Sequence, residues 1–370
     1  MAGKDAILIA ILAVAMVAVA AALFITFSGN DDEKVPTDPV DPVDPIDPVD
    51  PGPQYPEGIS FDSKTGELTS ETSVDWTITN ELLPFKERVS EKHSGTSVSL
   101  EPGLYSVSVG ADTFNVIADG SESRTIEWDY LMDGKKIHLS VTFDVDMREL
   151  AEKTLANREW NNGWYNNYFS NLTSLVSVND SIRSIVQQLT TLYTDNGGSM
   201  DDIQTYVDFL SSFAQLGIKY PQWETVPGTT QMSSDYYCWG QDEYWCDTLE
   251  TLYLGKGDCE DSSAVACAIL KAAGFSTAMV GGPGHVMAAV ALDSFTERNL
   301  VGYNISVPLD LAVSSDAYYV TDKTHTYYGI ETIKGQTPTG YLMKGQLKYI
   351  NATSSSGAMR PQGYSGYYAV

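Results

Sequence analysis

The hydrophobic pattern at the start of the chain predicts a membrane anchor. Residues 6–27 carry no charge and consist almost entirely of Ala, Ile, Leu, Val, Met and Phe, which matches the roughly 20 apolar residues that a helix needs to cross a bilayer. Lys4 precedes this run and acidic residues follow it, so the positive-inside bias places residues 1–5 in the cytoplasm and the rest outside the cell membrane. A cleaved signal peptide is the alternative. We favour an uncleaved anchor, because the run exceeds the usual apolar core of about 7–15 residues and no convincing Ala-x-Ala site follows it.

Residues 28–56 lack the apolar content for a core and predict a stiff stalk. Eight of the sixteen prolines lie between Pro36 and Pro56, and proline holds a chain in the extended polyproline conformation. Aspartate recurs at every third residue from Asp38 to Asp50, so these carboxylates line one edge of a helix with three residues per turn and repel one another. We expect a spacer on the order of 60–70 Å long, at about 3.1 Å per residue.

The pattern between residues 57 and 147 predicts a small β-sandwich. Apolar and polar residues alternate in several stretches, as strands with one buried face require: 97–100, 104–109, 113–117, 125–130 and 137–143. Asp119-Gly120 and Asp133-Gly134 lie between such stretches and predict hairpin turns. No catalytic constellation is present in this region.

From residue 148 to residue 370 the pattern predicts a second, mixed domain. Apolar residues at helical spacing predict helices over 181–193 and 201–214. A third helix begins at Cys259 after a glycine-rich turn and ends near Gly274. Strands are predicted after it, over 275–282, 285–292 and 317–324. The chain is therefore expected to be an α+β protein with an anchor, a stalk and two folded domains.

Charge excludes one class of partner. The chain holds 49 acidic and 22 basic residues, which gives a formal net charge of −27. A protein with this charge repels polyanions, so no nucleic-acid partner is expected. Residues 31–56 contribute −7 and residues 1–30 contribute zero, which leaves −20 for the folded domains. The folded part is therefore itself acidic and favours cationic or neutral substrates.

Cys259 is the candidate nucleophile. It stands at a helix N-terminus, where the free N–H groups and the helix dipole favour a thiolate. Asp258, Glu260 and Asp261 oppose that charge, so the thiolate needs a cationic partner, for which an imidazolium is suited. A lone cysteine at this position would more often be a small buried residue, and only the joint pattern with a histidine and an acid favours catalysis.

The histidine and the acid lie on the strands that follow. His285 opens the second predicted strand and Asp322 lies in the third. A helix followed by an antiparallel meander can bring the three side chains together. Cys259 would then attack, His285 would act as base and afterwards as acid, and Asp322 would orient the imidazole.

These motifs resemble those of the transglutaminase-like superfamily of cysteine enzymes, whose core is papain-like. The resemblance is carried by Glu250-Thr-Leu, by Gly-Lys-Gly-Asp-Cys259-Glu-Asp, by Gly284-His285 and by Tyr-Tyr-Val-Thr-Asp322. It covers residues 178–330 and is similar to the prokaryotic, membrane-anchored secreted branch. It implies a cysteine-bearing helix packed on an antiparallel sheet and the three catalytic roles given above. It also implies that Gln215, in an upstream segment, could assist the oxyanion. The insertion over 294–316 departs from the family pattern.

The loop before the nucleophile has two interpretations. It holds five aromatic residues, of which Trp239, Tyr244 and Trp245 could form a substrate rim; the alternative is a packed hairpin. Outside a cell, Cys238 and Cys246 could form a disulfide that closes this hairpin. Two thiols alone make a poor zinc site. We expect no metal and no cofactor.

Four sequons lie on the side predicted to be outside: Asn171, Asn179, Asn304 and Asn351. Asn179 could instead cap the helix that follows it. All four sites are candidates for glycosylation.

The leading interpretation is a surface-anchored thiol enzyme that acts on amide bonds of a protein or peptide through a thioester. The acceptor could be water, which gives a peptidase or amidase, or an amine, which gives cross-linking. The alternative is a non-catalytic surface binding or adhesion protein that uses the same scaffold. A small-molecule acyltransferase would need a cofactor pocket that no motif indicates.

Overall fold

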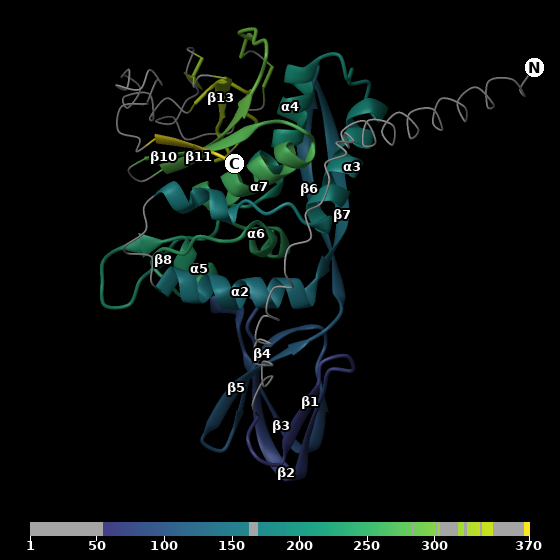
Figure 1. Ribbon diagram of the computed structural model, residues 1–370, viewed down its shortest axis with the longest axis vertical. Coiled ribbons are helices and arrows are strands. Elements are labelled where there is room, and N and C mark those ends of the chain that lie inside the picture. Colours follow the sequence, from purple (N-terminus) through teal and green to yellow (C-terminus); the bar gives the residue numbers. More distant parts are fainter. Residues whose placement is uncertain are drawn as a thin grey trace, which may run out of the picture. The chain divides into compact units, whose positions relative to one another are not determined.

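The computed structural model describes residues 55–162, 169–282, 285–300, 302–303, 317–321, 324–333, 335–342 and 366–370 (Figure 1). The predicted anchor and nearly all of the predicted stalk lie outside these residues. Among the described residues, no helix is both long and apolar enough to cross a membrane. Helices and antiparallel strands are both present, so the α+β class is confirmed.

The strands are β1 (Ile59–Asp62), β2 (Glu67–Asn80), β3 (Ser90–Ser99), β4 (Gly103–Val109), β5 (Asp112–Ala118), β6 (Ser121–Met132), β7 (Lys135–Asp146), β8 (Glu224–Thr225), β9 (Met232–Ser233), β10 (Thr277–Gly282), β11 (His285–Ala291), β12 (Tyr319–Thr321), β13 (Thr326–Ile330) and β14 (Gly366–Ala369). The helices and helical turns are η1 (Phe85–Glu87), α2 (Met147–Asn162), η3 (Phe169–Leu175), α3 (Asp180–Asp195), α4 (Ile203–Ser212), η4 (Phe213–Gly217), α5 (Asp235–Trp239), α6 (Thr248–Leu254) and α7 (Cys259–Ala272).

The first five strands form one antiparallel sheet in the described part of the chain. β2 is its long central strand and pairs with β1, β3 and β4, while β5 pairs with β4. The register of β2 against β3 shifts between Thr69 and Val74, as a β-bulge produces. Most of the buried side chains of this sheet, among them Trp76 and Val107, form a cluster of their own, whereas Leu104 of β4 belongs to the larger core. This sheet therefore has a small core separate from that of the rest.

The structure differs from the predicted β-sandwich in the placement of β6 and β7. These two strands pair with each other along their full length and with no other described strand. Their alternating apolar face belongs to the same core as α3, α4 and α7. Trp128 packs edge-on against Phe213 with 5.4 Å between ring centroids, and Tyr130 packs against Phe209 with 5.2 Å. Alternation specifies one apolar face but not the element that covers it, and here helices cover it.

The second core surrounds α7. This helix packs against β10 and β11 on one side and against α3, α4 and α6 elsewhere (Figure 1). The sheet beneath it has the order β12-β13-β11-β10-β14, so β11 is central. Gly282 of β10 pairs with His285 of β11, and Ala288 of β11 pairs with Ile330 of β13. The start of β11 and the end of β13 therefore lie at the same end of the sheet.

Glu250, in the first turn of α6, is a buried carboxyl group whose titration should change stability. Its oxygens accept hydrogen bonds from the Asp247 N–H at 2.9 Å, from the Asn157 amide at 2.7 Å and from the Tyr244 hydroxyl at 3.0 Å. Burial outweighs these bonds and raises the pKa of Glu250 from 4.5 to about 6. The folded state therefore binds this proton more tightly than the unfolded state does. The stabilisation is complete below pH 4.5 and is lost as the pH rises through about 6.

We expect the unfolding free energy of the wild type, relative to that of Glu250→Gln, to fall by about 2 kcal/mol between pH 4 and pH 7. The Glu250→Gln variant is less stable by an amount that does not depend on pH, because the glutamine amide group faces hydrogen-bond donors. Its unfolding free energy no longer contains the pH-dependent contribution of a proton bound at residue 250. Urea unfolding of both proteins at several pH values measures the difference, and the other carboxyl groups cancel. A difference that does not change with pH would contradict the assignment.

Candidate active site

Cys259 is the first residue of α7 and lies in the wall of a cavity of about 470 Å³. It is partly buried, and its thiol donates to Oε2 of Glu260 at 3.1 Å. Asp258 and Asp261 form a capping box at this helix start, which fixes the turn that presents the sulfur. The predicted helix start is therefore confirmed, and the thiol faces a space that a substrate could enter.

His285 opens β11 and forms hydrogen bonds on two sides. Its Nε2 lies 3.0 Å from Oε2 of Glu331, and the ring also forms a hydrogen bond with Cys259. Burial opposes the charged imidazole, but the Glu331 carboxylate and the bond to Cys259 outweigh it and raise the pKa of His285 to about 10. At neutral pH the ring is therefore an imidazolium.

The acid on His285 is Glu331, which the sequence analysis missed. Asp322, the predicted orienting acid, lies outside the described residues. Glu331 is fully buried and follows β13, the strand paired with β11. Because Ile330 pairs with Ala288 in antiparallel register, the chain beyond Ile330 runs toward His285. The predicted third strand contains β12, an edge strand that pairs with β13 alone among described strands. The feature of the sequence that could have identified Glu331 is an acidic residue directly after β13, the strand that follows the predicted third strand.

The contacts of Gln215 contradict its predicted role at the oxyanion. It lies in the π-helical turn η4 and is almost fully buried. Its amide nitrogen donates to the carbonyl oxygen of Glu331 at 2.9 Å and to that of Thr337 at 2.8 Å. Both N–H donors are thus used, and Gln215 lines a different cavity from that of Cys259. Its position makes it a residue that holds the main chain at Glu331.

The loop before the nucleophile is mainly a packed element. Tyr244 and Trp245 are 1% and 4% exposed, and Trp239 stacks on Tyr244 with 4.3 Å between ring centroids. Of the three predicted rim residues, only Trp245 touches the cavity. The exposed apolar residues at the cavity are instead Trp223 and Met232, which the sequence analysis missed.

The predicted disulfide is absent from the structure. Cys238 and Cys246 are both buried free thiols. Burial raises the pKa of Cys238 to about 12, and it raises the pKa of Cys246 well above its ordinary value. Both groups are therefore protonated thiols that pack as small apolar residues. Spacing in the sequence could not distinguish this packing from a bridge.

The sequons have different outcomes. Asn179 is buried, and its side-chain oxygen accepts a hydrogen bond from the Ile182 N–H at 2.9 Å, so the capping interpretation holds. Asn304 and Asn351 lie outside the described residues, as does the side chain of Asn171.

Four carboxyl groups lie close together at the N-terminus of α7. One oxygen from each of four residues lies within 4.8 Å of one oxygen from every other: Asp235, Asp258, Glu260 and Asp261. Burial and the neighbouring carboxylates raise the pKa of Asp235, Glu260 and Asp261 well above the usual range. These oxygens could hold a divalent cation or another positive group.

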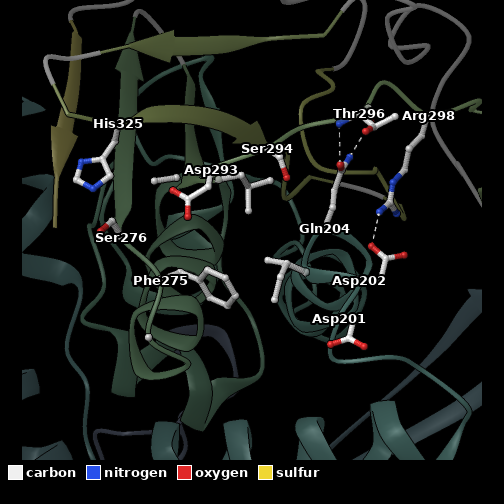
Figure 2. Close-up of a pocket in the computed structure, with 14 residues that line it drawn as sticks. Asp201, Asp202, Gln204, Phe275, Ser276, Asp293, Ser294, Thr296, Arg298 and His325 are labelled. Carbon is white, nitrogen blue, oxygen red and sulfur yellow. Dashed lines mark hydrogen bonds and ion pairs between the residues drawn. The ribbon is translucent and has the colours of Figure 1, made fainter. Parts of the chain in front are cut away.

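A larger cavity of about 640 Å³ lies elsewhere, between the start of α4, the start of β10 and the end of β11. Figure 2 shows Arg298 reaching Asp202 and Gln204 reaching the main chain of Thr296. The polar groups of Asp202, Gln204, Thr296 and Arg298 thus have partners within the lining of this cavity. Cys259 does not line it. Size alone therefore does not mark the reactive site.

Comparison of the chain with models of protein families, with curated proteins and with solved structures gave no match. The assignment of the site therefore depends on the geometry of Cys259, His285 and Glu331.

Proposed function

We propose that this protein is a cysteine enzyme that cleaves or transfers amide bonds of proteins or peptides through a thioester on Cys259. One observation carries the proposal: the hydrogen-bonded series from Cys259 through His285 to Glu331, at the wall of an open cavity. A non-catalytic binding protein on this scaffold would need neither the contact between sulfur and imidazole nor a carboxylate buried behind it. These contacts therefore favour the enzyme.

The chemistry follows from the three side chains. The Cys259 thiolate adds to the carbonyl carbon, His285 gives its proton to the departing amine, and the C–N bond breaks to leave a thioester. Water or an amine then loses a proton to His285 and attacks the thioester, which releases an acid or a new amide. Glu331 holds the ring in one orientation and stabilises its positive charge.

Electrostatics explain why a thiolate at Cys259 needs both His285 and the N-terminus of α7. Asp258 and Glu260 flank the sulfur and disfavour a negative charge on it. The imidazolium of His285 and the positive end of α7 favour that charge. In the reactive form, in which Cys259 has lost the proton that it donates to Glu260 in the structure, the imidazolium and the helix N-terminus would compensate the field of the neighbouring carboxylates.

The test is covalent labelling of the full chain with a peptidyl acyloxymethyl ketone, a probe that alkylates catalytic thiols. We expect labelling of Cys259 in the wild type and none in Cys259→Ala, located by mass spectrometry of the digested protein. Cys267→Ala, a matched control on the same helix, should react like the wild type because Cys267 is buried. Labelling that persists in Cys259→Ala, or that is no faster than with a free thiol, would sink the proposal.

A further inference from the structure

The lining of the cavity that contains Cys259 is rich in acidic side chains. Five acidic residues line it, and no lysine or arginine of the described part of the chain does: Asp235, Asp242, Glu243, Asp258 and Glu260. Its one described positive group, His285, already faces Glu331. Protons neutralise these crowded carboxyl groups in the empty cavity, and a bound cation from outside the described chain would take the place of those protons.

Three of these carboxyl groups each keep an oxygen that receives no hydrogen bond, Asp235, Asp258 and Glu260, and two of them are almost fully buried. Asp235 and Glu260 are both 2% exposed, and Oδ1 of Asp235 and Oε1 of Glu260 have no hydrogen-bond partner. The second oxygen of each is used, by the Tyr244 N–H at 2.8 Å and by the Cys259 thiol at 3.1 Å. A buried acceptor left without a donor destabilises the folded protein, and more strongly when it is charged. Such oxygens are suited to receive the N–H groups of a bound cation.

The same cavity offers apolar surface beside the charge. Trp223 and Met232 line it and are 50% and 52% exposed, and the Trp223 ring lies 6.0 Å from that of Tyr220. A bare metal ion gains no binding energy from an apolar surface. A lysine or arginine side chain does, because its aliphatic stem packs on apolar groups and its head binds carboxylates and aromatic faces.

We propose that this cavity binds a lysine or arginine side chain of a peptide substrate, next to the carbonyl group that Cys259 attacks. The cationic head binds the unused oxygens of Asp235 and Glu260, and the stem lies against Trp223 and Met232. This inference rests on the proposed function and names its substrate class. A divalent cation held by the carboxylates is the competing occupant.

The first experiment compares three acyloxymethyl ketone probes that differ only in the residue next to the ketone: lysine, norleucine or glutamate. Norleucine keeps the aliphatic stem and lacks the ammonium group, so the pair isolates the charge. We expect the lysine probe to label Cys259 about 10- to 100-fold faster than the norleucine probe, as a charged hydrogen bond implies. The glutamate probe should be the slowest.

The second experiment repeats the comparison in two variants. Asp235→Asn removes the charge while its amide oxygen can still accept from the Tyr244 N–H, so we expect the ratio of the lysine rate to the norleucine rate to lose most of its excess over one. Asp242→Asn is the matched control, because Asp242 lines the same cavity but both of its oxygens are held by Gln231. It should keep the preference to within about threefold.

Three outcomes separate the possibilities. Equal rates with lysine and norleucine would overturn the substrate class and leave the proposed function standing, whereas failure of all three probes would count against both. We expect calcium chloride alone to leave the thermal midpoint of the wild type unchanged. A saturable rise in that midpoint, absent in Asp235→Asn, would assign the carboxylates to a metal ion and overturn the inference.

Discussion

Replacement of Glu331 by glutamine should lower kcat about 10³- to 10⁴-fold with little change in the fold, as the loss of an orienting carboxylate does in triad enzymes. Glutamine matches glutamate in shape, and its oxygen can keep the hydrogen bond that Oε1 accepts from the Ile333 N–H at 3.0 Å. Its amide nitrogen would then face Nε2 of His285, where the carboxylate now lies at 3.0 Å. Two N–H donors would oppose each other, and the imidazolium would lose its counter-charge.

The pH profile gives this experiment a second readout. Glu331 is a main cause of the raised pKa of His285, which is about 10. Without the carboxylate the protonated ring is less favoured, so its pKa falls. We therefore expect the alkaline limit of acylation to move to lower pH in Glu331→Gln. A purely structural defect would lower the rate and leave that limit in place.

Asp322→Asn is the matched control for the acid. If Glu331 orients the ring, this variant should keep most of the wild-type kcat. If Asp322 does so, as the sequence motif predicts, the large loss should appear in Asp322→Asn and be absent in Glu331→Gln. Steady-state rates of both variants on one peptide substrate decide between the two acids.

The parts of the site that the sequence predicted are those fixed by local chemistry. The capped helix start at Cys259 and the strand that begins at His285 are each specified by a few adjacent residues, and both are where the pattern predicts them. Glu331 depends instead on which strand pairs with β11, and the sequence does not state that order. The role predicted for Gln215 was at the oxyanion, whereas its contact with the main chain at Glu331 is set by packing between distant segments.

The same distinction applies to the fold. The turn at Asp133-Gly134 is formed as predicted, with φ of 48° and 76°, because positive φ at both positions suits a tight hairpin. The partner of that hairpin was not predicted, because the apolar face of β6 and β7 fits a sheet or a helix layer equally well. Cys238 and Cys246 likewise have the spacing of a bridge, and only their burial as thiols distinguishes the two interpretations.

Replacement of Asp208 by asparagine should lower the free energy of unfolding by about 3–5 kcal/mol, because it breaks a buried ion pair from one side. Asp208 lies in α4 and is 3% exposed. Its Oδ2 accepts from Arg298 at 2.9 Å and from the Tyr303 hydroxyl at 3.2 Å, and its Oδ1 accepts from the Thr339 N–H at 2.7 Å. Burial raises the pKa of Asp208, and the Arg298 guanidinium opposes that shift. Asparagine would turn an N–H donor toward donors and leave Arg298 without this partner.

Urea unfolding of Asp208→Asn, Arg298→Met and the double variant measures the coupling between the two groups. We expect the double variant to be more stable than the sum of the two single losses implies, by about 1–3 kcal/mol, since the charge left unpaired in Asp208→Asn is then also removed. Strict additivity would mean that the pair contributes nothing beyond its separate contacts. Asp202→Asn is a control, because this residue binds the same arginine at 3.2 Å but is exposed, and it should cost less than about 1 kcal/mol beyond its helix cap.

The loss at Asp208 should also reach the reactive site. Asp208 binds Thr339, and two residues earlier the carbonyl of Thr337 accepts from Gln215, which also holds the carbonyl of Glu331. Loosening this segment removes one of the two contacts that fix the Gln215 amide, and so loosens the main chain at the orienting acid. We therefore expect Asp208→Asn to lower kcat at temperatures where it is still folded, while KM changes little. An unchanged kcat in a folded but destabilised variant would show that Glu331 is held without this segment.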